Sequence, residues 1–145
     1  MAGAGPKSRS ELGRELVFPA TADACAEVHA QVLAITAAAG FKDEAQLEID
    51  LALQEALANA LIHGCKRDPS KQIRCEVRRL ADGVSITIAD PGAGFDPQSV
   101  PDPLSEAGLG RFSGRGVHFI RSVMDEVNYA RNGAEVTMRK RLAER

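Results

Sequence analysis

The feature that most constrains the fold is a pair of alternating segments joined by a tight turn. Residues 72–80 and 84–89 alternate apolar and polar side chains, a rhythm typical of strands with one buried face. Ala81, Asp82 and Gly83 between them are residue types that hairpin turns prefer. The two segments therefore predict antiparallel neighbours in one sheet, and the helices are expected to cover its apolar face.

Two helical patterns precede this hairpin. Residues 22–39 are rich in alanine, with Thr21 at the N-cap position and Gly40 at the position of a left-handed C-terminal cap. Residues 43–64 form a longer amphipathic pattern. A short strand over residues 15–18 comes before both helices.

The segments after the hairpin complete the predicted fold. Residues 91–113 are rich in glycine and proline and predict an unusually long loop. Helical periodicity returns over residues 116–124, and residues 127–130 and 134–142 predict a closing strand pair around a turn at residues 131–133. The sum is an α+β fold, a two-layer sandwich of a mostly antiparallel sheet with helices on one face.

Length and charge bound the class of protein. A chain of 145 residues with 44% hydrophobic residues fits one domain, and the small polar residues 1–10 predict a disordered lead to a single domain over residues 11–145. A formal charge of −2 provides no field that would attract nucleic acid or an anionic membrane. No apolar run approaches the ~20 residues of a membrane span. We expect a cytoplasmic protein without direct nucleic-acid or membrane partners.

The cysteines give no sign of a disulfide framework or a zinc site. Cys25, Cys65 and Cys75 are odd in number and share no CxxC spacing. His63 lies two residues from Cys65, but the whole chain has only three histidines to add as ligands. We expect the cysteines to be reduced and buried.

Three polar side chains follow one another on the second helical pattern. Glu55, Asn59 and His63 are spaced i, i+4 and i+8, which places them on one stripe of the helix. Their neighbours are nearly all apolar, so the carboxylate and the amide would need a partner or ligand to offset their desolvation. The alternative interpretation is an exposed polar stripe on an ordinary amphipathic helix.

Two glycine-containing motifs follow. Asp90 ends a predicted strand and can accept a hydrogen bond from an exocyclic amine, while Gly92 and Gly94 let the backbone approach a ligand closely. An ordinary Asp-Pro-Gly turn is the alternative. Four further glycines precede the third helical pattern, where backbone N–H groups can face an anion such as a phosphate: Gly108, Gly110, Gly114 and Gly116. A flexible linker is the alternative interpretation of these four.

The order of these motifs resembles the ATP-binding domains of the GHKL superfamily, also called Bergerat-fold domains. Residues 51–64 look like the N-box of its anti-sigma-factor serine/threonine kinase branch, and residues 114–121 and 124–127 are similar to that branch. The resemblance covers about residues 16–142 and lacks the phosphoacceptor-histidine helices of a sensor histidine kinase. It implies an ATP-binding Bergerat fold with an ATP lid at about residues 91–115.

The resemblance also implies roles for individual residues. Asn59 would bind the Mg²⁺ that bridges the ATP phosphates, and Glu55 would act as general base toward an incoming hydroxyl. Asp90 would bind the adenine amino group, and His63 belongs to the N-box rather than being a phosphoacceptor. The glycines named above would bind the nucleotide through their backbone.

Two loop arginines and two departures from the family complete the implied site. Arg111 and Arg115 are candidates for the positive group on the γ-phosphate, with solvated loop arginines as the alternative. The family often shows Gly-Thr before its last strand where this chain has Gly133 and Ala134, so one polar contact is missing. Some relatives carry a lid arginine where this chain has Phe112.

The function implied by the resemblance is that of an anti-sigma factor. Such a protein uses ATP and Mg²⁺ to phosphorylate a serine or threonine of an anti-sigma-factor antagonist, controls the availability of a sigma factor, and forms a homodimer. The missing threonine favours an alternative, an ATP-binding partner-switching module that sequesters a protein without phosphoryl transfer. A plain α+β interaction domain is a third interpretation.

Overall fold

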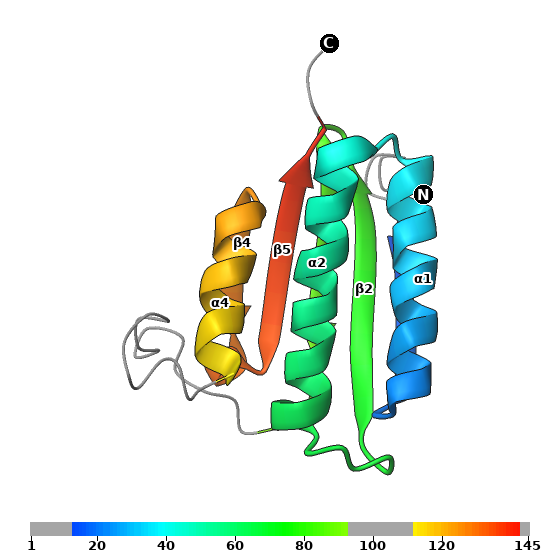
Figure 1. Cartoon of the computed structure of the whole chain (residues 1–145). Coiled ribbons are helices and arrows are strands. Elements are labelled where there is room, and N and C mark those ends of the chain that lie inside the picture. Colours follow the sequence, from blue (N-terminus) through cyan, green and yellow to red (C-terminus); the bar gives the residue numbers. More distant parts are fainter. Residues whose placement is uncertain (1–12, 93–111, 143–145) are drawn as a thin grey trace, which may run out of the picture.

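One sheet and three helices form two layers in the computed structural model, which describes residues 13–92 and 112–142 (Figure 1). The elements are β1 (Gly13–Pro19), α1 (Ala22–Ala38), α2 (Asp43–Asn59), the π-helical segment η2 (Ala60–Gly64), β2 (Gln72–Leu80), β3 (Gly83–Ala89), α4 (Phe112–Val123), β4 (Glu126–Ala130), the 3₁₀ turn η4 (Arg131–Gly133) and β5 (Glu135–Arg141). This arrangement confirms the predicted α+β fold.

The sheet is antiparallel throughout, with strand order β1-β2-β3-β5-β4. The predicted hairpin is present, and Leu80 pairs with Gly83 across a two-residue turn. β5 pairs with the free edge of β3, so β3 lies at the centre and all seven of its residues are buried. The strand that ends at the predicted acid–glycine motif is therefore the most protected strand of the sheet.

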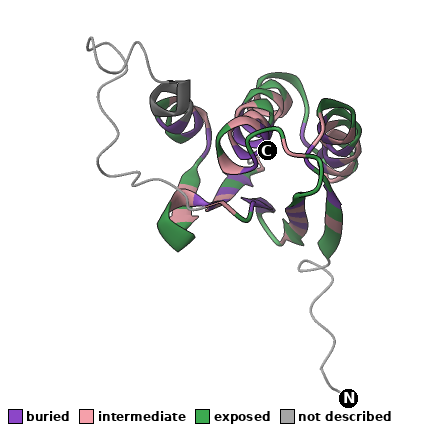
Figure 2. Cartoon of the chain, turned by 90° about the horizontal axis from the view of Figure 1, so that it is seen from below, coloured by how far each residue is buried: buried purple, intermediate pink, exposed green. Residues whose placement is uncertain are grey.

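The helices α4, α2 and α1 lie side by side on one face of the sheet (Figure 1). Their buried sides face the strands, as Figure 2 shows in a view along the layers. The largest fully buried side chains in this core include Val32, Ile49, Leu53, Ile73, Ile86 and Met138. The opposite face of the sheet carries ion pairs, among them Arg74 with Glu15 and with Glu135, each at 3.4 Å.

Local signals in the sequence have the predicted effects. The backbone N–H of Ala24 donates to the Oγ1 of Thr21 at 3.1 Å, so Thr21 caps α1 as predicted. Gly40 has a φ of +112°, the left-handed conformation expected after this helix. All three cysteines are free and buried.

A buried lysine connects the elements around the centre of the molecule. Lys140 on β5 donates from its Nζ to the Oε1 of Glu48 on α2, at 2.6 Å, and to the carbonyl oxygen of Val123, the last residue of α4. A buried ammonium group needs such partners to offset its desolvation. This cluster fixes the C-terminal end of α4 against α2.

The start of α4 differs from the prediction. The helix begins at Phe112 rather than near residue 116, so Gly114 and Gly116 lie in its first turns instead of ahead of it. Glycine disfavours a helix only weakly, and packing of Val117 and Ile120 in the core overrides that preference. Among the described helices, none has the length and apolar character needed to cross a membrane.

Candidate nucleotide site

A cavity of about 240 Å³ lies where the C-terminal end of α2 meets the ends of β3 and β5. It brings together three residues that the sequence analysis selected from two separate motifs, Asn59, His63 and Asp90. Lys66, Tyr129 and Ala134 also line it. Segments far apart in the sequence thus converge on one concave site, the usual setting of a ligand pocket.

The amide oxygen of Asn59 is an unsatisfied polar atom of this cavity. Its Oδ1 is buried and has no hydrogen-bond partner among the described residues. A buried polar atom without a partner carries a desolvation penalty, which a ligand at this position would offset. Amide and carboxylate oxygens suit Mg²⁺, so the residue fits the predicted metal contact.

Glu55 lies one helical turn before Asn59 and is half-buried, but it is not among the residues that line the cavity. Burial raises the pKa of its carboxyl above the usual value. The Tyr129 phenol has its pKa raised to about 12, mainly by burial; the Arg121 charge lowers it and the Glu55 charge raises it further. Arg121 lies over the Tyr129 ring, 5.4 Å from its centroid. The charge of Glu55 therefore affects Tyr129, and Tyr129 lines the cavity.

Asp90 is held rigidly where β3 ends. Its Oδ1 accepts a hydrogen bond from the Gly92 N–H at 2.8 Å, and its own N–H donates to the Ala134 carbonyl at 2.9 Å. Burial raises the pKa of the Asp90 carboxyl, while the Gly92 hydrogen bond and the Arg131 and Lys71 charges lower it. The carboxylate is thereby fixed in one orientation toward the cavity.

Two glycines are required beside this carboxylate because the backbone passes very close. A Cβ atom on Gly64 would overlap the Asp90 carboxylate. A Cβ atom on Gly92 would come within 2.5 Å of the Gly64 carbonyl oxygen. Gly92 therefore permits a close approach to Gly64 and Asp90, and its predicted approach to a bound nucleotide stays a prediction.

The end of the second helix is π-helical, which the sequence analysis missed. The Cys65 N–H donates to the Ala60 carbonyl at 2.8 Å, a bond that spans five residues. The predicted α-helical spacing therefore holds for Glu55 and Asn59 but ends before His63, whose side chain is exposed at the rim of the cavity. Single π-turns inside helices occur frequently at functional sites.

The remaining predicted positions fall at or beyond the limits of the described residues. Gly94, Gly108, Gly110 and Arg111 lie outside these residues, as does most of the predicted lid. Arg115 lies in the first turns of α4, and its side chain is not described. Their predicted roles remain predictions.

Some lining residues were not selected from the sequence. Tyr129 is the one tyrosine of the chain and alternates inward with Val127 on a predicted strand, which was an available signal. Lys66 adopts a left-handed backbone conformation, with φ of 53°, and no local pattern indicates this. Ala134 was noted only as a departure from a family motif.

Comparison with known proteins identifies the family of this chain. Residues 18–140 match the family described as the histidine kinase-like ATPase domain. The serine-protein kinase RsbW of Listeria innocua serovar 6a is 28% identical over 118 residues, which cover 77% of this chain and 75% of that protein. The anti-sigma F factor of Clostridium perfringens strain SM101 is 36% identical over 101 residues, covering 66% of this chain and 71% of that protein.

The chain belongs to the histidine kinase-like ATPase family, and the GHKL resemblance is confirmed. Membership in this family implies the use of ATP. Within the family, the chain is a protein kinase of the serine/threonine type, as predicted from its motifs.

Proposed function

We propose that this protein is an anti-sigma factor that phosphorylates a serine or threonine of an anti-sigma-factor antagonist. The unphosphorylated antagonist displaces a sigma factor from the kinase, and phosphorylation returns the sigma factor to it. The names of the relatives support this assignment. The proposal places the protein in the cytoplasm, where sigma factors act.

One observation carries the proposal: Asn59 and Asp90 line the same cavity, but they differ in whether the protein provides hydrogen-bond partners for their side chains. Asp90 is oriented by its neighbours, whereas the buried Oδ1 of Asn59 has no partner among the described residues. A nucleotide with its base at Asp90 and its metal-bound phosphates at Asn59 would satisfy both groups. The exocyclic amine of adenine matches the carboxylate acceptor.

Mg²⁺ fits the Asn59 end of the cavity because this ion is held mainly by phosphates and water, with few protein ligands. When bound, it would neutralise the charge that develops on the phosphates during transfer. Asn59 would hold it through the amide oxygen. The positive groups of the lid remain to be assigned, with Arg111 and Arg115 as our candidates.

Glu55 is the proposed general base. The substrate hydroxyl oxygen forms a bond to the γ-phosphorus as the bond from that phosphorus to the β–γ bridging oxygen breaks, and ADP leaves. The hydroxyl proton passes to the Glu55 carboxylate. Because burial raises the pKa of Glu55, its carboxylate binds a proton more strongly than an exposed one.

The test is phosphoryl transfer from labelled ATP to an antagonist encoded in the same genome. The unmutated protein should yield an acid-stable phosphoprotein, and Glu55→Gln should lower the rate by at least about 100-fold, within the range for general base catalysis. Glu126→Gln makes the same change at an exposed site on β4 and should leave the rate unchanged. Equal rates for the two variants would contradict the assigned base.

A second candidate function is nucleotide-dependent binding without transfer. The observation that favours it is Ala134, which is buried in the cavity wall and carries no hydroxyl group. A protein of this kind would bind ATP and its partner tightly yet leave the antagonist unlabelled. Stoichiometric labelling of the antagonist would eliminate it.

A further inference from the structure

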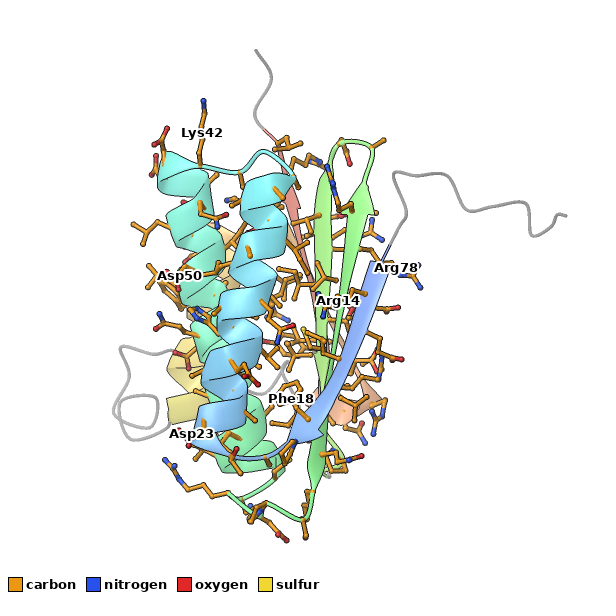
Figure 3. All side chains as sticks on the ribbon, turned by 90° about the vertical axis from the view of Figure 1, so that its right-hand side faces the viewer. Arg14, Phe18, Asp23, Lys42, Asp50 and Arg78 are labelled. Carbon is orange, nitrogen blue, oxygen red and sulfur yellow. The ribbon has the colours of Figure 1, made fainter. Side chains whose placement is uncertain are left out.

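The outer face of the helical layer combines exposed leucines with a strong excess of acidic residues. Residues 22–64 contain seven acidic residues and one basic residue, Lys42; Glu48 is paired with the buried Lys140 and Glu55 lies near Tyr129, so five acids remain for the outer face. Asp23 and Asp50 lie on this layer, whereas Arg78 lies at the far side of the molecule on the sheet (Figure 3). The near-neutral chain therefore has one distinctly negative face.

A continuous stripe runs along the exposed side of α2. Leu47 and Leu51 are 54% and 37% exposed, and they are the two exposed large apolar side chains on the described helices. At about 100° per residue, Gln54 and Ala58 fall on the same stripe as these leucines. The stripe runs over the twelve residues 47–58, and its eleven steps of 1.5 Å make it roughly 17 Å long.

The stripe leads into a groove between α1 and α2. This groove has a volume of about 350 Å³, and small or apolar side chains form most of its walls: Ala22, Cys25, Ala26, Leu57, Ala58 and Leu61. Small side chains let another helix approach closely. The length of the stripe matches that of an amphipathic helix of about twelve residues, which could lie along the groove.

Acidic groups border this surface on both helices. Asp23 and Glu27 are exposed on α1, and Glu44 is exposed near the start of α2. Asp50 lies beside the stripe and accepts hydrogen bonds from His29 across the groove, at 2.7 Å, and from Gln54, at 3.0 Å. A second copy of this chain or an anionic lipid surface would be repelled, whereas a helix with lysines and arginines beside its apolar stripe would be attracted.

We infer that the α1–α2 surface is the docking site for a basic amphipathic helix of the sigma factor. This inference rests on the proposed function, which makes a sigma factor the partner. A sigma factor binds DNA, and DNA-binding proteins carry basic helices. Leu47 and Leu51 anchor the apolar stripe of that helix, and the bordering acids orient it. The nucleotide cavity and the sigma-factor surface then use different sides of α2.

The test compares truncations of exposed apolar residues on opposite faces of the molecule. Leu47→Ser with Leu51→Ser should weaken binding of the purified sigma factor at least about tenfold, as expected for central interface anchors. Val17→Ser on β1 removes a side chain that is 56% exposed on the other side of the molecule, so it is the matched control and should leave binding unchanged. If Val17→Ser weakened binding and the double leucine variant did not, the inference would be overturned.

A charge reversal tests the same surface independently. Asp23→Lys with Glu27→Lys should slow sigma-factor association at low salt, whereas Asp82→Lys in the turn between β2 and β3 should not. Both helical-layer variants should still bind ATP and phosphorylate the antagonist. If these variants no longer bound the antagonist but still bound the sigma factor, the α1–α2 surface would be the docking site of the antagonist and the inference would be wrong. If the unmutated protein bound no sigma factor of its genome, the proposed function would fail as well.

Discussion

The two ends of the nucleotide cavity differ in how completely the protein satisfies its own polar groups. At one end, the Asp90 carboxylate accepts from Gly92, and the Asp90 backbone bonds to Ala134 and Arg131. At the other end, the Asn59 Oδ1 is buried with no partner among the described residues. The protein itself orients the polar group at the first end, whereas the buried polar atom at the second end needs a ligand as its partner.

The two ends therefore illustrate two different requirements of a binding site, exact backbone placement and a buried polar atom kept for the ligand. The Asp90 end requires exact backbone placement, which glycines at positions 64 and 92 permit. The Asn59 end retains a desolvated polar atom, which destabilises the free protein in order to favour the bound state. Substitutions at the Asp90 end should therefore affect stability, and substitutions at the Asn59 end should mainly affect binding.

The largest effect is expected for Asn59→Ala. Removal of the only proposed protein ligand should weaken ATP binding in the presence of Mg²⁺ by at least about 100-fold, the upper range for changes in the surroundings of a metal. The free energy of unfolding should fall by no more than about 0.5 kcal/mol, since the lost group has no partner to leave behind. Calorimetric titration with and without Mg²⁺, together with urea unfolding, measures both quantities.

Asn128→Ala, on an exposed position of β4, is the control for that experiment. It should change neither quantity. A large loss of stability in Asn59→Ala with ATP affinity retained would reverse the comparison between the two ends.

A smaller effect, on stability, is expected for Gly64→Ala. The new methyl group would overlap the Asp90 carboxylate, and overpacking of this kind destabilises a fold by about 1–3 kcal/mol. Urea unfolding should show the loss. Adding Asp90→Ala should recover much of the stability without restoring ATP binding, because the overlap is then relieved. An unchanged midpoint in Gly64→Ala would contradict the close approach.

The smallest effect is a change in pH dependence for Glu55→Gln. Burial raises the pKa of Glu55 in the folded protein, so the folded state holds this proton to higher pH than the unfolded state does. The stabilisation is full below the unfolded pKa and is lost as pH rises through the folded pKa. Glutamine has no such proton. The unfolding free energy of the unmutated protein should therefore fall relative to that of Glu55→Gln as pH rises from about 4 to 7, and parallel curves would contradict the raised pKa.

Much of the fold could be predicted because its signals are local. The hairpin of β2 and β3, the Thr21 cap and the left-handed Gly40 each depend on residues adjacent in the chain. The pairing of β3 with β5 is different, since 46 to 58 residues separate the paired positions and periodicity contains no information on the partner. The predicted fold class was thus right, while the strand order had to come from the structure.

Sequence analysis could select candidate site residues where the chemistry of a single side chain, together with its neighbours in the chain, indicates a ligand contact. Asn59 and Glu55 were selected because polar groups among apolar neighbours need partners, and Asp90 was selected because it ends a strand beside two glycines. The π-turn at the end of α2 was missed because it reflects the contact between Gly64 and Asp90, which comes from tertiary packing rather than from local preference. The early start of α4 was missed for the same kind of reason, because core contacts outweigh the weak effect of two glycines.

The π-turn also makes the number of residues between Asn59 and the following loop a structural requirement. Each residue of a helix turns the chain by about 100°, so a deletion within residues 60–64 would rotate the glycine away from Asp90 even if every motif residue were kept. An insertion would rotate the glycine in the opposite direction and would also remove it from Asp90. For this segment, the number of residues is as strict a structural requirement as their identity.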